Sequence, residues 1–287
     1  MSAGGASTSG AGAGVGVLPG PRGGRGPSSA RGGLGGGGGG LAAALVGSLP
    51  PYLRRAFKWR QMDIEYTLFQ MRLLLWTPKK VYASAFYNKQ TKNQWARDDP
   101  SFVLLTAAAV AGAGMLWVLC FGRSSGVWHS LAMILSAVLV DFLGVGAALA
   151  TGGWALANRH LRVKPSPSES ESAASFGVEQ HVEWLFAFDI HCNAFVPLFG
   201  LLYVVQLLLS PLLLMHGFLP AVLANSLYAV AFAQYHYITF LGYSALPFLE
   251  RTEVFLYPVG VTALAFIVAC LSGFNASHFV IRSVYFG

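Results

Sequence analysis

The chain has 287 residues, of which 54% are hydrophobic and only 11% are charged, and its formal net charge is +7. Together with a positive mean hydropathy, this balance excludes a soluble protein with one core and indicates a membrane protein with several spans. The first 50 residues lack the apolar segment of a cleavable signal peptide, so we expect the first span to act as the insertion signal.

Residues 1–49 consist mainly of Gly, Ala and Ser, with an unbroken glycine run at residues 35–40. Such a composition buries too little apolar surface to offset its backbone entropy, and it predicts a disordered tail. Arginine-glycine clusters at residues 22–26 and 31–33 are similar to repeats that stack on single-stranded RNA, but they lack interleaved aromatic residues. RNA binding by the tail is therefore a minor alternative to a plain flexible leader.

Residues 50–100 form a block that mixes ten basic residues with aromatic ones, as is typical of the membrane interface. Within it, Ile64, Leu68, Met71 and Leu75 follow helical spacing and predict a helix lying flat on the cytosolic leaflet. The apolar run at residues 66–76 is about half as long as a span needs, which favours a surface or re-entrant helix.

Two positions in this block, each a capping residue followed by proline, indicate where helices start. Thr77-Pro78 predicts a cap followed by proline at the first position of a second short helix. Asp99-Pro100 repeats the device before the first span, where the carboxylate would accept hydrogen bonds from free backbone amides.

Five later windows are long and apolar enough to cross about 30 Å of hydrocarbon. The second and fourth exceed about 20 residues, so we expect them to tilt or to project from the membrane. The predicted fold is an all-α polytopic bundle that follows the N-terminal interfacial helices and ends in a lumenal tail at residues 274–287. The five spans are expected at residues 101–121, 127–157, 184–209, 219–246 and 254–273.

The distribution of Lys and Arg predicts the orientation, because cytoplasmic flanks collect positive charge. The first 100 residues hold thirteen of the nineteen basic residues, and the loops after the second and fourth expected spans hold four more. Only Arg123 and Arg282 would lie on the lumenal side of the membrane. The N-terminus is therefore expected in the cytosol and the C-terminus in the lumen.

Polar residues inside the expected spans predict a buried network of Asp141, Asp189, Asn193 and His236. A helical wheel puts Asp141 on a stripe of small residues that would face the bundle. Asp141 would accept a hydrogen bond from His236 or Asn193, whereas His191 lies off the face shared by Asp189 and Asn193. Such a network either fixes helix packing or serves a proton-coupled or pH-sensing transporter that uses Asp141, Asp189 and His236. The stripe comprises Ala137, Asp141, Gly144, Ala148 and Gly152.

Catalytic motifs do not accompany these residues. His181, Glu183, Asp189 and His191 have no zinc-site spacing, and Cys120, Cys192 and Cys270 form no CxxC pair. We therefore expect a protein that is not an enzyme and that holds no metal or other cofactor.

Several ungapped blocks closely resemble the uncoordinated-fifty family of Golgi membrane proteins, from residue 52 to about residue 280. The Gly-rich tail and residues 165–175 depart from the family pattern. The matching blocks are RQMD at residues 60–63, KQTKNQWARDDPSF at 89–102, EW at 183–184, FAFDIH at 186–191, NAF at 193–195, YITFLGYSALPFL at 237–249 and LYP at 256–258.

This resemblance implies a five-span protein of the Golgi or early secretory pathway with a cytosolic N-terminus and no catalytic activity. The endoplasmic reticulum and the inner nuclear membrane are alternative locations. The family is associated with vesicle-mediated protein transport, with recruitment of large Arf guanine-nucleotide exchange factors, with assembly of nicotinic receptor cargo and with RNA binding. We expect membrane lipid and an exchange factor as the main partners.

The cytosolic block offers the largest surface to a soluble partner. Its second half combines charge with an aromatic anchor of the kind enriched in binding hot spots. The alternative is a collar that only seats the bundle on lipid. The predicted partner-binding residues are Lys89, Gln90, Lys92, Gln94, Trp95 and Arg97.

Overall fold

The computed structural model describes residues 62–122, 126–163 and 180–285. The predictions for the tail at residues 1–49, including RNA binding, and for the segment at residues 165–175 lie outside these ranges. Within them the regular secondary structure is helical, apart from an isolated β-bridge between Arg162 and Leu249.

Five described helices are long and apolar enough to cross a membrane, which confirms the predicted fold class. They match the expected windows to within four residues at every end. The spans are Ser101–Phe121, Val127–Leu161, Trp184–Leu213, Phe218–Ser244 and Thr252–Leu271.

Three of these spans contain more than one kind of helical turn. Span one is α5 (Ser101–Phe121) and span four is α11 (Phe218–Ser244). Span two consists of α6 (Val127–Ser136), the π-helical η2 (Ala137–Gly144), α7 (Val145–Leu156) and η3 (Ala157–Leu161). Span three consists of α9 (Trp184–Phe199), η4 (Gly200–Val205) and α10 (Gln206–Leu213). Span five consists of η5 (Thr252–Leu256) and α12 (Tyr257–Leu271).

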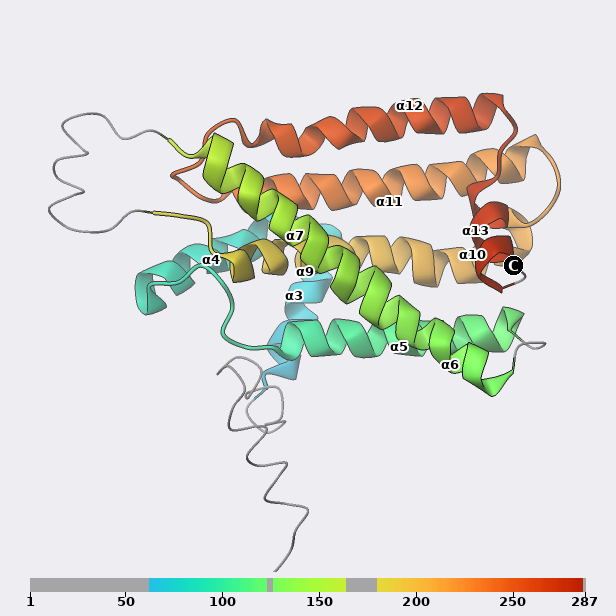
Figure 1. The fold of residues 1–287 in the computed structure, drawn as a ribbon, viewed down its shortest axis with the longest axis horizontal. Helices are drawn as coiled ribbons and strands as arrows, with labels where there is room; N and C mark the ends of the chain where they lie inside the picture. The colour runs from blue at the N-terminus through green and yellow to red at the C-terminus, as the bar shows by residue number, and fades with distance from the viewer. Residues whose placement is uncertain (1–61, 123–125, 164–179, 286–287) are drawn as a thin grey trace, which may run out of the picture. The chain divides into compact units, whose positions relative to one another are not determined.

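Span two is tilted, as its length predicted, and α6 and α7 run diagonally across the other spans (Figure 1). Its buried face changes phase at η2. The step from Ala137 to Phe142 is five residues, and the following steps to Gly146 and Ala150 are four. A π-helical segment adds a residue to the turn, so the inward face moves by one position there.

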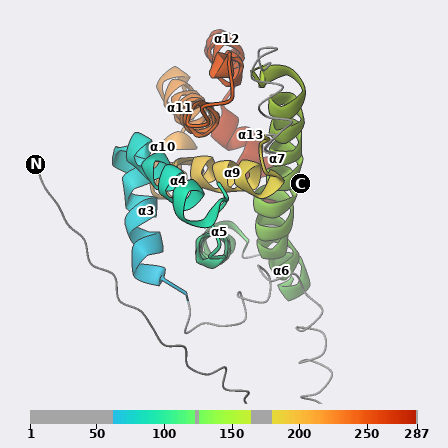
Figure 2. The same ribbon diagram turned by 90° about the vertical axis from the view of Figure 1, so that its left-hand side faces the viewer.

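The helix α9 forms the centre of the bundle and packs against α11, α7, α3 and α5 (Figure 2). Every residue from 186 to 197 is buried, including Asp189, His191 and Asn193. Burying polar groups costs free energy unless they find partners, so each of the three needs a hydrogen bond inside the protein.

The helix α3 (Ile64–Trp76) lies across the direction of α5 (Figure 2). Its polar Thr67 and Gln70 are buried, and Thr67 Oγ1 lies 2.9 Å from Ser101 Oγ at the start of α5. Large apolar side chains point away from the protein instead. This inverted pattern suits a helix whose outer face meets lipid. The exposed side chains are Ile64, Tyr66, Leu68, Phe69, Leu75 and Trp76.

Asp99 fixes the junction between α3 and α5. Its Oδ1 accepts a hydrogen bond from the Ser101 amide at 3.0 Å, as predicted, and its Oδ2 accepts from the Asp63 amide at 3.2 Å. At the next helix, α4 (Pro78–Lys92), proline occupies the first position as expected, but the Thr77 side chain makes no capping bond.

The last two helices of the chain are α12 and the terminal helix α13 (Ala276–Tyr285). The helix α12 packs against α11 and η5, and it leaves most of its surface exposed. The helix α13 returns to pack against α10 and α11, with Ser277 and Ile281 buried. Residues 276–285 are therefore an ordered part of the bundle.

Candidate functional site

One end of the bundle gathers α4, the starts of α5 and α9, and the turn between α11 and η5 (Figure 1). The contacts that join them are the Trp95–Phe248 ring pair at 6.1 Å and the hydrogen bond from Tyr82 Oη to the Ile238 carbonyl at 3.1 Å. We call this the basic end, because it carries Lys79, Lys80, Lys89, Lys92, Arg97, Arg162 and Arg251.

Residues 93–100 dock on the first half of α9 through backbone amides. Glu183 accepts hydrogen bonds from the amides of Trp95 and Ala96 at 3.1 and 3.2 Å, and Asp189 Oδ2 accepts from the Arg97 amide at 2.7 Å. Carboxylates make strong hydrogen bonds to amides in dry surroundings. Asp189 in span three and Glu183 at the N-terminal cap of that span therefore hold residues 93–100 through their backbone amides.

The Arg97 side chain completes this junction. Its Nη2 donates to Asn193 Oδ1 at 2.5 Å, and its guanidinium lies 4.2 Å from the centre of the Phe102 ring. Its charge also interacts with Asp189. Arg97, Asp189 and Asn193 thus form a buried polar cluster on the face of α9 that the helical wheel predicted.

Trp95 contributes apolar packing at the same place. Its side chain is 4% exposed and lies between Phe186 and Phe248, with ring centres 6.2 and 6.1 Å away. Trp95 is therefore not an exposed aromatic anchor, and the half-buried Arg97 binds span three through Asn193; partner binding at these two residues stays a prediction. Gln94 is half-buried and donates to the Asp98 carboxylate.

The other predicted partner residues stay near the surface. Gln90 is exposed, Lys92 forms an ion pair with Asp98 at 2.5 Å, and Lys89 Nζ lies 5.8 Å from the centre of the Trp95 ring. One side of α4 is exposed along its length. We call it the α4 face; its members are Lys79, Lys80, Ala83, Tyr87, Gln90 and Thr91.

The opposite side of α4 is anchored in the bundle. Val81, Tyr82 and Ala85 are buried there. Burial raises the pKa of the Tyr82 phenol, so the hydroxyl stays protonated and donates to the Ile238 carbonyl. The α4 face is therefore held on a rigid support.

The predicted intramembrane network is divided into separate groups. Asp189 and Asn193 belong to the Arg97 cluster, whereas Asp141 Oδ2 accepts from Tyr203 Oη at 3.1 Å instead of from His236 or Asn193. The reason is the phase change at η2, which points Phe142 inward and turns Asp141 toward span three beyond Pro197.

His191 bridges spans two, three and four. Its Nε2 lies 3.1 Å from the Phe142 carbonyl and its Nδ1 lies 2.9 Å from Tyr235 Oη. Because the carbonyl only accepts, Nε2 carries the proton and Nδ1 accepts from the tyrosine. The helical wheel correctly separated His191 from Asp189 and Asn193.

The close helix contacts use other glycines than the predicted stripe. A Cβ on Gly146 would overlap the His191 ring, and one on Gly153 would overlap the Tyr243 hydroxyl. By contrast, nothing lies within 4 Å of such an atom on Gly152. The inward stripe therefore runs through Gly146 and Gly153, not through Gly144 and Gly152.

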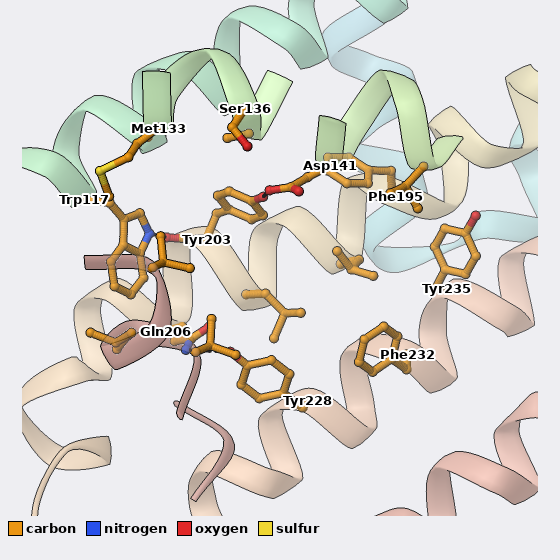
Figure 3. A pocket seen from close by; sticks show the side chains of 18 of the residues that line it. Trp117, Met133, Ser136, Asp141, Phe195, Tyr203, Gln206, Tyr228, Phe232 and Tyr235 are labelled. Atoms are coloured by element: carbon orange, nitrogen blue, oxygen red, sulfur yellow. Dashed lines mark hydrogen bonds between the residues drawn. The ribbon is translucent and has the colours of Figure 1, made fainter. Parts of the chain in front are cut away.

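Asp141 and His236 both line a pocket of about 860 Å³ between spans two, three and four, with α5 and α13 at its end. Figure 3 shows Asp141 and Tyr203 pointing toward each other on its wall, with Gln206 and Tyr228 facing each other farther along. A second cavity of about 420 Å³ shares the side chains of Leu149, His191, Tyr235 and His236 with the first.

In the part of the chain that the structure describes, no group of three or more His, Cys, Asp or Glu side chains is placed to hold a metal ion. The three cysteines are unpaired, and Cys192 is buried. Sequence reasoning missed Glu183 as an anchor and Tyr203 and Tyr235 as partners. The signal that could have identified Glu183 as an anchor was its position directly before an apolar helix that carries a second acidic residue, Asp189, near its start.

Comparison with known proteins agrees with the resemblance noted from the motifs. The UNC-50 family profile matches residues 52–286. The chain is 46% identical over 239 residues to "Protein unc-50 homolog" of Dictyostelium discoideum, covering 83% of this chain and 88% of that protein. It is 39% identical over 230 residues to the Homo sapiens protein of that name, covering 79% and 83%. No solved structure matches the chain.

The match spans the interfacial helices, all five spans and the terminal helix, and the alignments cover most of the length of both relatives. The buried clusters at Arg97 and His191 lie inside the matched region. The chain belongs to the UNC-50 family of membrane proteins.

Proposed function

We propose that this protein resides in the Golgi or early secretory membranes and supports vesicle-mediated transport by recruiting a soluble factor to the α4 face. The expected partner is a large Arf guanine-nucleotide exchange factor, and receptor assembly would follow from transport. The chain acts by binding, without catalysis. Family membership supports the setting, and the anchored α4 face supports the mode of action.

The single observation that carries the proposal is the contrast between the two sides of α4. One side is locked by Tyr82 and by the docked residues 93–100, while the other presents Lys80, Tyr87 and Gln90 to the outside. A preorganised surface loses little entropy when it binds. Lysines next to an exposed tyrosine suit a partner surface that is acidic with an apolar centre.

The orientation gives a first expected result. A glycosylation site added in a flexible extension after Gly287 should be modified if the C-terminus is lumenal. The native sequence Asn275-Ala276-Ser277 has the Asn-x-Ser pattern of an acceptor site but should stay bare. Asn275 Nδ2 donates to the Leu213 carbonyl, and the hydroxyl of Ser277 is buried. Gel mobility before and after endoglycosidase digestion measures both, and an unmodified extension would contradict the proposed orientation.

Partner binding gives the second expected result. Lys80→Glu combined with Tyr87→Ala should lower co-purification of the exchange factor at least about tenfold, because one hot-spot residue commonly contributes about 2 kcal/mol or more. Arg282→Glu, at the other end of the bundle, is the matched control. Thermal unfolding should be similar for the double variant, the control and the unmodified protein. Equal recovery of the exchange factor by the double variant and the control would refute binding at the α4 face.

A further inference from the structure

The 860 Å³ pocket lies within the span-forming helices, and its wall is mostly apolar. Several of its lining side chains are also exposed at the surface, among them Val145, Leu149 and Phe232. At this depth the surroundings are hydrocarbon, so the pocket opens to the lipid phase. Its size falls in the range of about 300–1,000 Å³ that small-molecule sites occupy.

Asp141 gives this apolar pocket a specific chemical preference. Among the described residues that line it, none is Lys or Arg, and the carboxylate has a hydrogen bond only from Tyr203. Asp141 Oδ1 is left without a partner in the described part of the chain. A carboxylate in apolar surroundings is stabilised most by a cation that also donates hydrogen bonds.

His236 lines the pocket from α11. It contacts the Tyr235 ring, and within the described ranges its imidazole has no hydrogen-bond partner. About two turns earlier on the same helix, Tyr228 also lines the pocket, and its Oη accepts from Gln206 at 2.9 Å. The pocket thus combines one acidic group and a few neutral acceptors with a long hydrocarbon lining, as Figure 3 shows for the labelled side chains.

We infer that this pocket binds a long-chain amphiphilic amine, with its ammonium group on Asp141 and its hydrocarbon chain along the apolar wall. Asp141 lies fourteen residues from the start of Val127–Leu161, about 21 Å along the helix axis, and is thus well inside the membrane. A phosphate or carboxylate headgroup would meet the Asp141 charge with no Lys or Arg among the described lining residues to balance it. This inference is independent of partner binding at the α4 face.

The test uses the full-length protein in lipid nanodiscs with sphingosine that carries a diazirine in its chain. After photolysis, peptide mass spectrometry should locate the label on pocket residues such as Phe232 and Leu149. Unlabelled sphingosine should compete, whereas the alcohol and the fatty acid of equal chain length should not. Equal competition by the alcohol would show that the site does not recognise an amine and would overturn the inference.

Variants separate the site from general lipid contact. Asp141→Asn should reduce labelling at least about tenfold, while Glu253→Gln, which removes an exposed carboxylate outside the pocket, should leave it unchanged. Ser136→Phe keeps Asp141 and fills part of the pocket, so it should reduce labelling even if Asp141→Asn does not fold. Labelling that survives Ser136→Phe, or that spreads equally over the outer surface of α12, would overturn the inference.

Discussion

Replacing Asp189 by alanine should lower the free energy of unfolding by about 1–3 kcal/mol, the usual cost of leaving a buried hydrogen-bond donor without its acceptor. The carboxylate is 4% exposed and accepts from the Arg97 amide at 2.7 Å. Its loss would leave that amide without an acceptor and would remove a negative charge that interacts with the Arg97 guanidinium. Thermal or denaturant unfolding of the purified protein in detergent measures the change.

A second substitution distinguishes an unpaired charge from simple loss of packing. Arg97→Met in the Asp189→Ala background should restore part of the stability, because it removes the half-buried positive charge that the first substitution left without a nearby negative one. Asp189→Asn, which keeps the shape and an acceptor oxygen, should cost less than alanine. Glu250→Ala, at an exposed position, should change stability by no more than about 0.5 kcal/mol. A double variant less stable than Asp189→Ala alone would contradict this account.

Gly146→Leu should destabilise the bundle by about 3 kcal/mol or prevent its assembly, because even the first carbon of the new side chain would overlap the His191 ring. Spans two and three would have to separate, which would break the bond from His191 to the Phe142 carbonyl. The fraction of monodisperse protein and its melting temperature in detergent measure this effect.

The matched control lies on the same helix. Gly152→Leu adds the same side chain where nothing lies within 4 Å of the new Cβ, so the change should be neutral or slightly stabilising through helix propensity. If Gly152→Leu were as damaging as Gly146→Leu, the assignment of the inward face of α7 would be wrong.

The span pattern was predictable because apolar length reports membrane crossing directly. The windows at residues 101–121 and 184–209 begin where α5 and α9 begin. The first follows Asp99-Pro100, and the second follows Glu183. The pairing of Asp189 with Asn193 followed from a regular helix, and α9 is regular up to residue 199. Local rules succeed where the helix keeps its standard period.

The stripe on span two was mispredicted because its period is not constant. A helical wheel assumes 100° per residue, and η2 breaks that assumption between Ala137 and Phe142. Likewise, the burial of Trp95 depends on Phe186 and Phe248, which lie far away in the sequence. An exposed aromatic and a buried one look alike until the distant partners are placed.

The bond between Tyr82 and the Ile238 carbonyl has a consequence for biosynthesis. It joins residues 156 positions apart, and at a synthesis rate of about 5–20 residues per second the second partner emerges roughly 8–30 s after the first. Span four must be synthesised before α4 can take its final position against it. The α4 face therefore takes its finished form only on chains that have inserted four spans, so a factor that binds it would discriminate against incomplete chains still on the ribosome.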